Sequence, residues 1–459
     1  MSSPLSRAAR LPLVGRWSRR ARPGHGPRHP RTWLLVAGGG TMGHVSPGLA
    51  IAEAVVGRGC PRPAVHFVGS KRGVEATRVP DAGFRLTLLG GRGLQRRLTL
   101  ANVVAVAGLV GAFAKAIVLV TKTRPAVVLA LGGYASLPCG LAAVLLRIPV
   151  VVAEQNAVPG AANRLVGRAA RACAISFEGT NLPRAVLTGN PVRPALAHLD
   201  RGAERAGARQ RLGVAPDRVL LLAYGGSLGA RRINRAVWDA RQQWAGRGDL
   251  AVRHVVGDRD WPDRPPGVHA HDAGGSLSMS SNESSSESMY ESPSASGLGG
   301  QGGEGLDYRA VIYEQDMATA LCAADVVLSR AGASTVAELA SVGVGSILVP
   351  LPIATGDHQT ANARVLVDAG AAVLIPDAEL DAARLVDQLN ALLAAPDTLP
   401  AMAAAATTVG RPDAAERVAD LLLRHARTPW ENAAGTSSVP NPSPGPAGPA
   451  ASSRVAVLP

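Results

Sequence analysis

Short, uninterrupted apolar runs recur along the first half of the chain, separated by stretches long enough for a helix. Five of these runs, all rich in Val, Leu, Ile and Ala, predict strands: Leu34–Ala37, Ala64–Gly69, Ala126–Ala130, Val150–Ala153 and Ala172–Ile175. Apolar runs without polar alternation are typical of parallel strands that are buried on both faces. The pattern from Thr32 to about Arg193 therefore predicts a parallel sheet covered by helices.

The same pattern starts again after Thr188–Arg193, where the pair Asn190-Pro191 favours a turn. An apolar run at Val219–Tyr224 leads into another glycine-rich loop, and Gly345–Val349 predicts a later strand. A chain of 459 residues is too long for one core, because a single core rarely organises more than about 250–300 residues. We therefore expect two similar α/β domains that face each other, at residues 32–193 and 194–410.

Three segments interrupt this pattern and are predicted to be disordered. Residues 1–31 are rich in Arg, Pro and Gly and contain no acidic residue. Residues from about 262 to 306 are largely polar, with a long stretch of Ser, Gly and Glu, and residues 428–459 form a tail rich in Pro, Ser and Ala. Segments with so few apolar side chains cannot bury enough surface to offset the entropy of ordering.

The formal net charge of +14 raises the question of an anionic partner. Much of the arginine lies in residues 1–31, and neither a set of RNA-stacking aromatic residues nor a zinc-ligand spacing accompanies it. We therefore expect no nucleic-acid partner, while an anionic membrane surface or phosphorylated substrates remain compatible with the charge. The four cysteines lie singly in apolar contexts, which predicts buried, reduced thiols: Cys60, Cys139, Cys173 and Cys322.

The segment from Phe84 to Val120 combines leucines with arginines before an apolar, helix-like stretch. The side chains concerned are Leu88, Leu89, Leu94 and Leu98, with Arg92, Arg96 and Arg97. Arginines beside exposed leucines suit a membrane-surface patch, and an amphipathic helix packed on the sheet is the equal alternative. No transmembrane span is predicted, because the longest candidate, Val103–Val120, is interrupted by Lys115.

A glycine-rich loop follows the first predicted strand, and a helix is expected from about Pro47. Gly38, Gly40 and Gly43 match the G-x-G-x-x-G spacing of dinucleotide-binding proteins. The next strand, however, lacks the acidic residue that would bind an NAD ribose, and His44 follows the last glycine directly. The loop is therefore either a phosphate cradle or a plain tight turn between a strand and a helix.

Polar side chains also follow the later strands of the first domain. Tyr134 lies in a second glycine-rich loop, and Glu154 and Asn156 follow a third strand. Ligands of doubly wound sheets bind at the carboxyl ends of the strands. We therefore expect these three side chains and His44 to share one crevice.

In the second domain, the segment from Ser329 to Glu338 carries the strongest signal for an anion. Ser334 and Thr335 are expected at a helix N-terminus, which suits a diphosphate, and Glu338 could accept hydrogen bonds from a ribose diol. Ser227 and Arg193 could complete a phosphate pocket. The alternative for each residue is structural: a helix cap, a surface charge or a turn.

Taken together, six motifs in fixed order closely resemble the MurG family of bacterial glycosyltransferases. They are Gly40–His44, Glu154–Asn156, Gly189–Arg193, Gly225–Ala230, Arg330–Glu338 and Asp357–Asn362. The resemblance runs from about Leu34 to Ala426. It implies an α/β fold of the GT-B type, in which two Rossmann-like, doubly wound domains face each other across a cleft, and a helix at residues 411–427 that returns to the first domain.

The resemblance also assigns roles to residues of this chain. On the donor side it implies that Asn156, Arg193 and Ser227 bind UDP-N-acetylglucosamine, with the sugar hydroxyls at Gln359. The helix segment that would bind the diphosphate and ribose comprises Ala333, Ser334, Thr335, Val336, Ala337 and Glu338. Thr41, Met42 and Gly43 would face the diphosphate and the acceptor, and His44, with Glu154 or Tyr134 nearby, would serve the acceptor side. This chain departs from the family pattern at Met42, Ala153 and Leu228.

The implied reaction is the inverting transfer of N-acetylglucosamine from UDP to the C4 hydroxyl of the muramoyl unit of lipid I, which gives lipid II for peptidoglycan synthesis. His44 would be the general base. No metal or other cofactor is expected, and the enzyme would be peripheral at the cytoplasmic face of the cell membrane. Rival hypotheses are a UDP-sugar 2-epimerase or a glycolipid synthase of the same fold, and a non-enzymatic binder of nucleotide sugars or nucleic acid.

Overall fold

The computed structural model describes residues 31–71, 73–90, 100–226, 229–271 and 305–432, with the backbone alone at 100–107 and 432. Most of the predicted terminal tails and of the polar insertion lies outside the described residues. So do Ser227 and Leu228, and the arginines and two of the leucines of the predicted membrane patch: Arg92, Arg96, Arg97, Leu94 and Leu98. Residues 428–432, predicted as the start of the C-terminal tail, are described and end in a 3-10 turn at Trp430–Asn432.

The first domain is built on a seven-stranded sheet with the order β3-β2-β1-β4-β5-β6-β7, and every pair of neighbours is parallel. Its strands are β1 Leu34–Gly38, β2 Val65–Ser70, β3 Arg85–Leu89, β4 Val127–Gly132, β5 Val150–Glu154, β6 Ala172–Ile175 and β7 Ala185–Leu187. The five predicted strands are all present. Strands β3 and β7 lie at the two edges, where partly exposed positions break the apolar run that marks the central strands.

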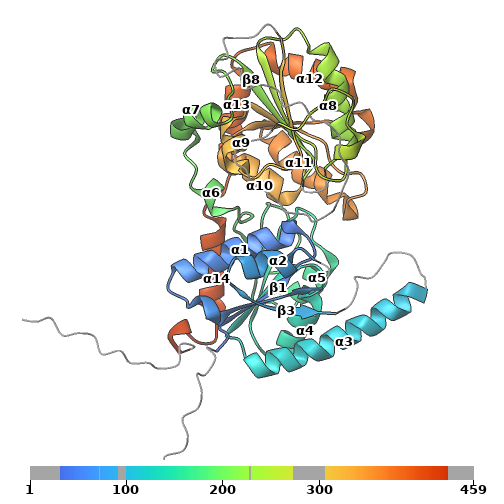
Figure 1. Ribbon diagram of the computed structural model, residues 1–459. Helices are drawn as coiled ribbons and strands as arrows, with labels where there is room; N and C mark the ends of the chain where they lie inside the picture. The colour runs from blue at the N-terminus through green and yellow to red at the C-terminus, as the bar shows by residue number, and fades with distance from the viewer. Residues whose placement is uncertain (1–30, 72, 91–99, 227–228, 272–304, 433–459) are drawn as a thin grey trace, which may run out of the picture.

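Helices cover both faces of this sheet (Figure 1). They are α1 Met42–Gly57, α2 Glu75–Asp81, α3 Leu100–Thr123, α4 Ser136–Leu145 and α5 Ala161–Gly167. Alternate residues of β1 enter different cores: Leu34 and Val36 pack with α1, whereas Leu35 and Ala37 pack with α3 and α4. Because β1 is buried on both faces, its sequence is apolar throughout.

Helix α1 begins at Met42, five residues before the predicted start near Pro47. A proline interrupts a helix because it lacks an N–H group and its ring crowds the preceding turn. Here Pro47 is nevertheless buried inside α1, in the second turn. The predicted helix start was therefore wrong, and His44 lies within the first turn of the helix and not in the loop.

The second domain is built on a six-stranded parallel sheet with the order β10-β9-β8-β11-β12-β13. Its strands are β8 Val219–Tyr224, β9 Leu250–Val255, β10 Asp307–Val311, β11 Val326–Ser329, β12 Gly345–Leu348 and β13 Ala372–Leu374. Its helices are α6 Pro194–Ala197, α7 Arg201–Arg211, α8 Arg231–Gln243, α9 Met317–Ala323, α10 Ala333–Val342, α11 His358–Asp368, α12 Ala382–Leu393 and α13 Thr398–Val409. Short 3-10 turns lie at Arg62–Ala64, Trp261–Asp263, Thr355–Asp357, Asp377–Glu379 and Trp430–Asn432. Two parallel sheets, each sandwiched between helices, confirm the predicted α/β fold.

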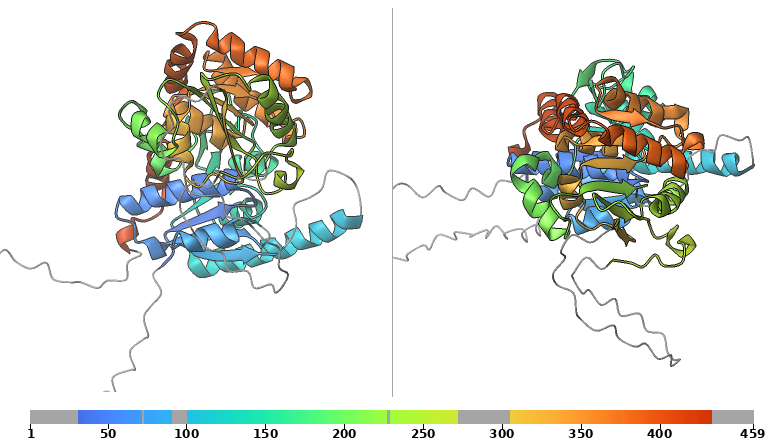
Figure 2. Two further views of the ribbon diagram at one scale, coloured as in Figure 1. Left: turned by 45° about the horizontal axis from the view of Figure 1, so that its top comes forward. Right: turned by 90° about the horizontal axis from the view of Figure 1, so that it is seen from above.

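The last helix, α14 (Ala414–His425), packs on the first domain beside α1, although it follows the second domain in sequence (Figures 1 and 2). Its buried residues Val418 and Leu422 join the core that also holds Leu34 and Val36. Beyond α14, the indole of Trp430 meets that of Trp33 edge to face, with ring centroids 5.6 Å apart. The chain therefore crosses between the domains twice.

Helix α3 lies on the outside of the first domain and packs along α4 (Figure 1). Its inner face buries Ala112, Ala116 and Val120, while Val110 and Val118 on its outer face are 63% and 52% exposed. Within the described part of the chain, no helix is long and apolar enough to cross a membrane. Leu89, predicted as part of an exposed patch, is 2% exposed at the end of β3, so that part of the prediction was wrong.

Candidate functional site

A buried carboxylate of the protein itself holds the first glycine-rich loop, residues 38–43, in place. Glu75, at the start of α2, is 1% exposed. One of its oxygens accepts a hydrogen bond from the N–H of Gly40 at 2.8 Å, and the other accepts one from Ser70 at 2.6 Å. Gly39 has φ = +149°, and a Cβ there would lie 2.3 Å from the Glu75 carboxylate. The N–H of Gly40 is therefore already paired with a carboxylate and is not free to bind a phosphate.

His44 lies at the carboxyl end of the first sheet, in the first turn of α1. Its Nδ1 is 3.1 Å from the hydroxyl of Thr41, the N-cap residue of α1. Gly132, at the end of β4, has φ = +95°, and a Cβ there would come within 3.1 Å of the His44 Nε2. Glycine at this position therefore gives the imidazole its space.

The charge state of His44 is set by its surroundings. Burial lowers the pKa of the imidazole, the carboxylates of Glu154 and Glu75 raise it, and His358 of the second domain lowers it. A lowered pKa keeps the ring neutral, and hence able to accept a proton, at neutral pH.

Glu154 and Tyr134 stand next to His44 but are occupied by other partners. The Glu154 carboxylate is 3% exposed. It accepts hydrogen bonds from the N–H and side chain of Asn156, from the N–H of Gly160 and from the side chain of Asn163, at 2.9 to 3.3 Å. The Tyr134 hydroxyl lies 3.1 Å from the carbonyl of Gly90 and 3.2 Å from that of Gly108, which ties the second glycine loop to α3. Burial raises the pKa of the Tyr134 hydroxyl, so it stays protonated.

On the opposite side of the cleft, the N-terminus of α10 points its free N–H groups at the same space. Gly332 is the N-cap residue and provides no side-chain cap, so Ala333, Ser334 and Thr335 form an uncapped first turn. The hydroxyl oxygen of Ser334 is buried and has no hydrogen-bond partner among the described residues. An uncapped helix N-terminus with a spare hydroxyl is suited to phosphate oxygens.

Glu338, one turn further along α10, is paired with Arg193. The Arg193 Nε donates to the Glu338 carboxylate at 3.1 Å, and the Glu338 side chain is 12% exposed. Burial raises the pKa of Glu338, and the adjacent guanidinium opposes that rise. Arg193 is the N-cap residue of α6 and lies in the segment that links the two domains. Its positive charge therefore lies against α10 of the second domain.

The first-domain residues around His44 and the second-domain residues on α10 line one interdomain cleft of about 550 Å³. The predicted residues in its wall are Thr41, Met42, Gly43, His44, Asn156, Arg193, Ala333, Ser334, Thr335, Glu338 and Gln359. A smaller hollow of about 350 Å³ continues on the first-domain side of His44 and is lined by Tyr134 and Glu154. His44 and Asn156 border both spaces.

Two predicted donor residues lie away from this wall. Val336 is fully buried in the core of the second domain, and Ala337 packs against the same core. Ala333, Ser334 and Thr335 all reach the cleft because they form the end turn of α10, whereas beyond that turn only the face that carries Glu338 does. Ser227 lies outside the described residues.

The domains also touch directly across the cleft. The side chain of Asn362, on α11, is fully buried. It accepts a hydrogen bond from the N–H of Ala157 at 2.9 Å and donates to the side-chain oxygen of Asn156 at 3.2 Å. A third contact joins it to the carbonyl of Ala331 at 3.2 Å, next to the first turn of α10. Asn156 therefore belongs to an interdomain contact as well as to the wall of the cleft.

The sequence patterns did not single out three residues at this site. Glu75 follows β2 by five positions, and its role depends on the chain folding back to Gly40. His358, whose Nδ1 lies 2.9 Å from the carbonyl of Thr355, and Tyr313, which is 54% exposed, both line the cleft from the second domain. Only His358 had a sequence signal, since it precedes Gln359 in a recognised motif.

Among the residues that the structure describes, no group of three His, Cys, Asp or Glu side chains could hold a metal ion.

Comparison with known proteins covers both halves of the chain. Residues 34–175 match the glycosyltransferase family 28 N-terminal domain, and residues 280–418 match the glycosyltransferase family 28 C-terminal domain. The chain is 40% identical over 396 residues to a UDP-N-acetylglucosamine–N-acetylmuramyl-(pentapeptide) pyrophosphoryl-undecaprenol N-acetylglucosamine transferase of Alkalilimnicola ehrlichii, with 86% of this chain and 99% of that protein covered. A protein of the same name from Syntrophus aciditrophicus is 36% identical over 399 residues, with the same coverage.

Solved structures give the same picture of the fold. The crystal structure of MurG from Acinetobacter baumannii superposes with a TM-score of 0.62 at 28% identity, and covers 86% of this chain and 99% of its own. A UDP-GlcNAc 2-epimerase from Neisseria meningitidis superposes with a TM-score of 0.55 at 12% identity, with 86% of this chain and all of that chain covered. At that identity the second likeness concerns the fold alone.

Proposed function

Since the chain belongs to the MurG family of glycosyltransferases, we propose that its interdomain cleft transfers N-acetylglucosamine from UDP-N-acetylglucosamine to lipid I, the pyrophosphoryl-undecaprenol-linked muramoyl peptide. The protein is an N-acetylglucosaminyltransferase, and its product is lipid II. The observation that carries the assignment of the site is that one cleft joins His44 of the first domain to the first turn of α10 in the second.

His44 acts as the general base. The acceptor hydroxyl attacks the anomeric carbon of the donor sugar and must lose its proton during that step. The burial that lowers the pKa of His44 keeps its imidazole neutral for this purpose. Glu154 acts through its neighbours: its four hydrogen bonds orient the segment from Asn156 into the first turn of α5, and its charge limits the fall of the His44 pKa.

The departing UDP is stabilised from the second domain. As the sugar–oxygen bond breaks, negative charge grows on the diphosphate, and the uncapped first turn of α10 presents N–H groups and the positive end of its dipole to it. The unpaired Ser334 hydroxyl supplies one more donor. Glu338 accepts hydrogen bonds from the ribose hydroxyls, and Arg193 favours the charged form of that carboxylate and holds it in place.

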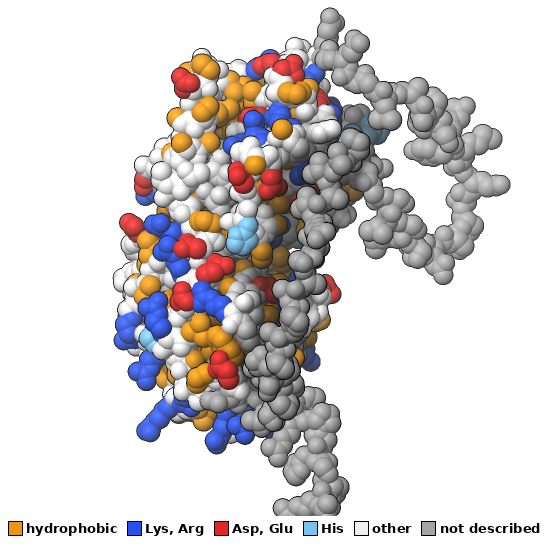
Figure 3. All heavy atoms as spheres, turned by 90° about the vertical axis from the view of Figure 1, so that its left-hand side faces the viewer, with side chains coloured by type: hydrophobic (Ala, Val, Ile, Leu, Met, Phe, Trp, Pro, Cys, Tyr) orange, Lys and Arg blue, Asp and Glu red, His pale blue; other side chains and the backbone are white. Residues whose placement is uncertain are grey.

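The acceptor is a lipid, so the enzyme must work at a membrane surface, and we assign that contact to the first domain. Leu145, at the end of α4, is 63% exposed and Leu165, on α5, is 42% exposed. A hollow of about 740 Å³ beside them is lined by basic groups: Arg147, Arg168, Arg171, Arg184, Arg424 and His425. Lys and Arg side chains also gather over the first-domain end of the face in Figure 3. Apolar tips beside arginines suit an anionic bilayer at the cytoplasmic side.

The membrane assignment is tested by co-sedimentation with vesicles that contain anionic phospholipid. Leu145→Glu should reduce the bound fraction, because it places a negative charge against the lipid surface. Ile353→Glu, a change of an 85% exposed residue on the second domain, is the matched control and should leave binding intact. Equal binding by wild type and Leu145→Glu would refute the assignment.

The transfer itself is tested by measuring UDP release from UDP-N-acetylglucosamine with and without lipid I. Release that depends on lipid I supports the proposal, and conversion of UDP-N-acetylglucosamine alone would instead show a 2-epimerase. The same assay with EDTA tests whether a divalent metal is needed. Binding of UDP without any turnover would favour a non-enzymatic nucleotide-sugar binder.

A further inference from the structure

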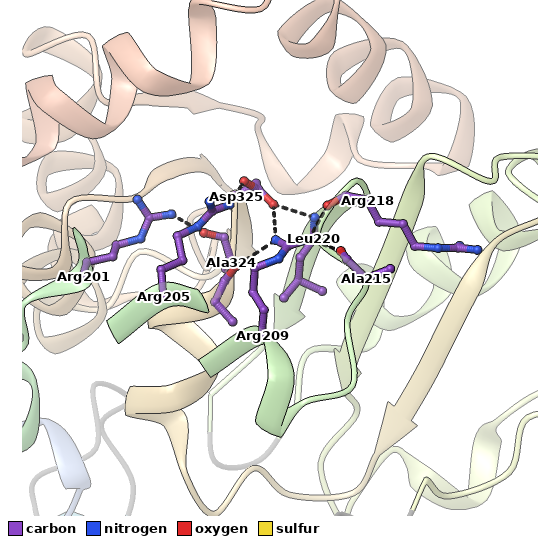
Figure 4. Close-up of polar contacts among 9 residues, drawn as sticks. Arg201, Arg205, Arg209, Ala215, Arg218, Leu220, Ala324 and Asp325 are labelled. Atoms are coloured by element: carbon purple, nitrogen blue, oxygen red, sulfur yellow. Dashed lines mark hydrogen bonds and ion pairs between the residues drawn. The ribbon is translucent and has the colours of Figure 1, made fainter. Parts of the chain in front are cut away.

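Helix α7 carries three arginines on one face, outside the cleft. Arg201, Arg205 and Arg209 are spaced by four residues, so their side chains leave the helix in the same direction. Figure 4 shows the three guanidinium groups side by side, directed at the start of β11 and β8. In sequence, α7 follows directly after the interdomain segment and α6.

A single carboxylate, that of Asp325, lies against these three charges. Arg205 and Arg209 both pair with Asp325, and Arg209 does so at 2.9 Å. Arg201 donates to the carbonyl of Ala324, and Arg209 donates to those of Ala323, Ala215 and Arg218. Ala323 and Ala324 lie at the C-terminal end of α9, where cations are favourable, so part of the cluster is explained by the docking of α7 on the domain.

Docking leaves part of the cluster unexplained. The Nε atoms of all three arginines are buried without a hydrogen-bond partner among the described residues, and the Arg209 residue is only 6% exposed. Burial lowers the pKa of Arg201, and the neighbouring Arg205 lowers it further. Three guanidinium groups against one carboxylate leave an excess of two positive charges in a partly buried place, which an anion would relieve.

The cluster borders a hollow of about 1150 Å³. Its other wall consists of Val342 and Gly343 at the end of α10, and of Ala403, Ala404 and Thr407 on α13. No Asp or Glu is among the described residues of either wall. One wall is therefore cationic and the other is almost entirely apolar, and the space exceeds that of an ordinary small-molecule site.

We propose that the hollow between α7 and α13 is a second ligand site, which binds an organic phosphate, with the phosphate against Arg201 and Arg205 and the apolar part against Ala403 and Ala404. The site is distinct from the donor cleft, because α10 separates the two: its first turn lines the cleft and its last residue lines the hollow. A bound ligand would hold α7, and with it the interdomain segment, against the second domain.

The test is calorimetric titration of the full-length protein with phenyl phosphate and with inorganic phosphate, at constant ionic strength. Saturable binding of phenyl phosphate is expected, and phenyl phosphate should bind several-fold more tightly than inorganic phosphate because its ring reaches the apolar wall. Arg205→Gln should weaken binding at least about tenfold, since a charge-assisted hydrogen bond is lost. Arg384→Gln, a change of an exposed arginine on α12, is the matched control and should leave binding unchanged.

Two cavity-filling variants separate this site from the donor cleft. Ala404→Trp fills the hollow and leaves all three guanidinium groups in place, so it should abolish phenyl phosphate binding and spare UDP binding. Thr335→Trp fills the cleft and should do the reverse. Retention of UDP binding shows that Ala404→Trp is folded, so the proposal can still be judged if Arg205→Gln fails to fold.

Four results would overturn the proposal. They are the absence of saturable phenyl phosphate binding, its loss only in Thr335→Trp, an equal loss in Arg205→Gln and Arg384→Gln, and equal affinity for phenyl phosphate and inorganic phosphate.

Discussion

Replacing Glu75 with glutamine tests whether the buried carboxylate supports the catalytic loop. In the wild type, its two oxygens accept hydrogen bonds from the N–H groups of Gly40 and Ser70, at 2.8 and 2.6 Å. Glutamine keeps one acceptor oxygen but turns an NH₂ group toward the other N–H, so one buried donor loses its partner. Because Glu75 is 1% exposed, water cannot replace that partner.

The expected cost follows from these contacts. A hydrogen bond to a charged group contributes about 1.5–3 kcal/mol, so Glu75→Gln should lower the free energy of unfolding by about 2 kcal/mol. The loop should also lose its fixed position, and because His44 follows it directly, turnover should fall roughly 10- to 100-fold. Denaturant unfolding and steady-state UDP release measure the two effects.

The variant should also shift the pH dependence of the reaction. The negative charge of Glu75 raises the pKa of His44, so its removal lowers that pKa. A base with a lower pKa stays deprotonated to lower pH, and the acid limb of kcat/KM should therefore move toward lower pH. Glu53→Gln is the control, because Glu53 on α1 pairs with Arg62 at a site that is 37% exposed and should contribute little. Wild-type stability together with an unshifted acid limb in Glu75→Gln would refute the reasoning.

Three further predictions concern the cleft. His44→Ala should lower kcat by about 10²- to 10⁴-fold with little change in the KM for UDP-N-acetylglucosamine; an unchanged kcat would show that another group takes the proton. Glu338→Ala should raise the donor KM because the ribose loses its acceptor, and a wild-type donor KM would exclude that role. Asn362→Ala leaves the N–H of Ala157 without its partner and should destabilise the interdomain contact by about 1–3 kcal/mol. Thermal unfolding and kcat would both measure this destabilisation. An unchanged melting temperature together with an unchanged kcat would contradict the prediction.

The sequence predicts the central strands well, because burial on both faces requires an uninterrupted apolar run. Strands β1 and β8 are examples, with every residue buried in the first and all but Val219 in the second. The edge strand β3 was missed because its burial is only partial. The start of α1 was placed too late, since Pro47 signals a helix start more often than a helix interior.

The site was predictable only where its residues lie in recognised motifs. His44, Thr335 and Glu338 come from three such motifs, and the cleft brings them together. The contact between Asn156 and Asn362 joins positions 206 residues apart, and no local pattern encodes it. Glu75 was missed for a related reason, because the carboxylate arrives from the helix after β2 and not from the end of that strand.

The return of α14 to the first domain has a consequence for how the cleft can open. The two crossings lie against each other: Gly189, with φ = +86°, is so close to Arg411 that a Cβ on it would lie 2.4 Å from the Arg411 Cβ. Two adjacent connections on one side of a molecule act as a hinge. A hinge allows the two domains to move apart and resists sliding of one domain over the other. Any opening of the cleft for substrate entry therefore pivots about this point, where the two crossings lie together.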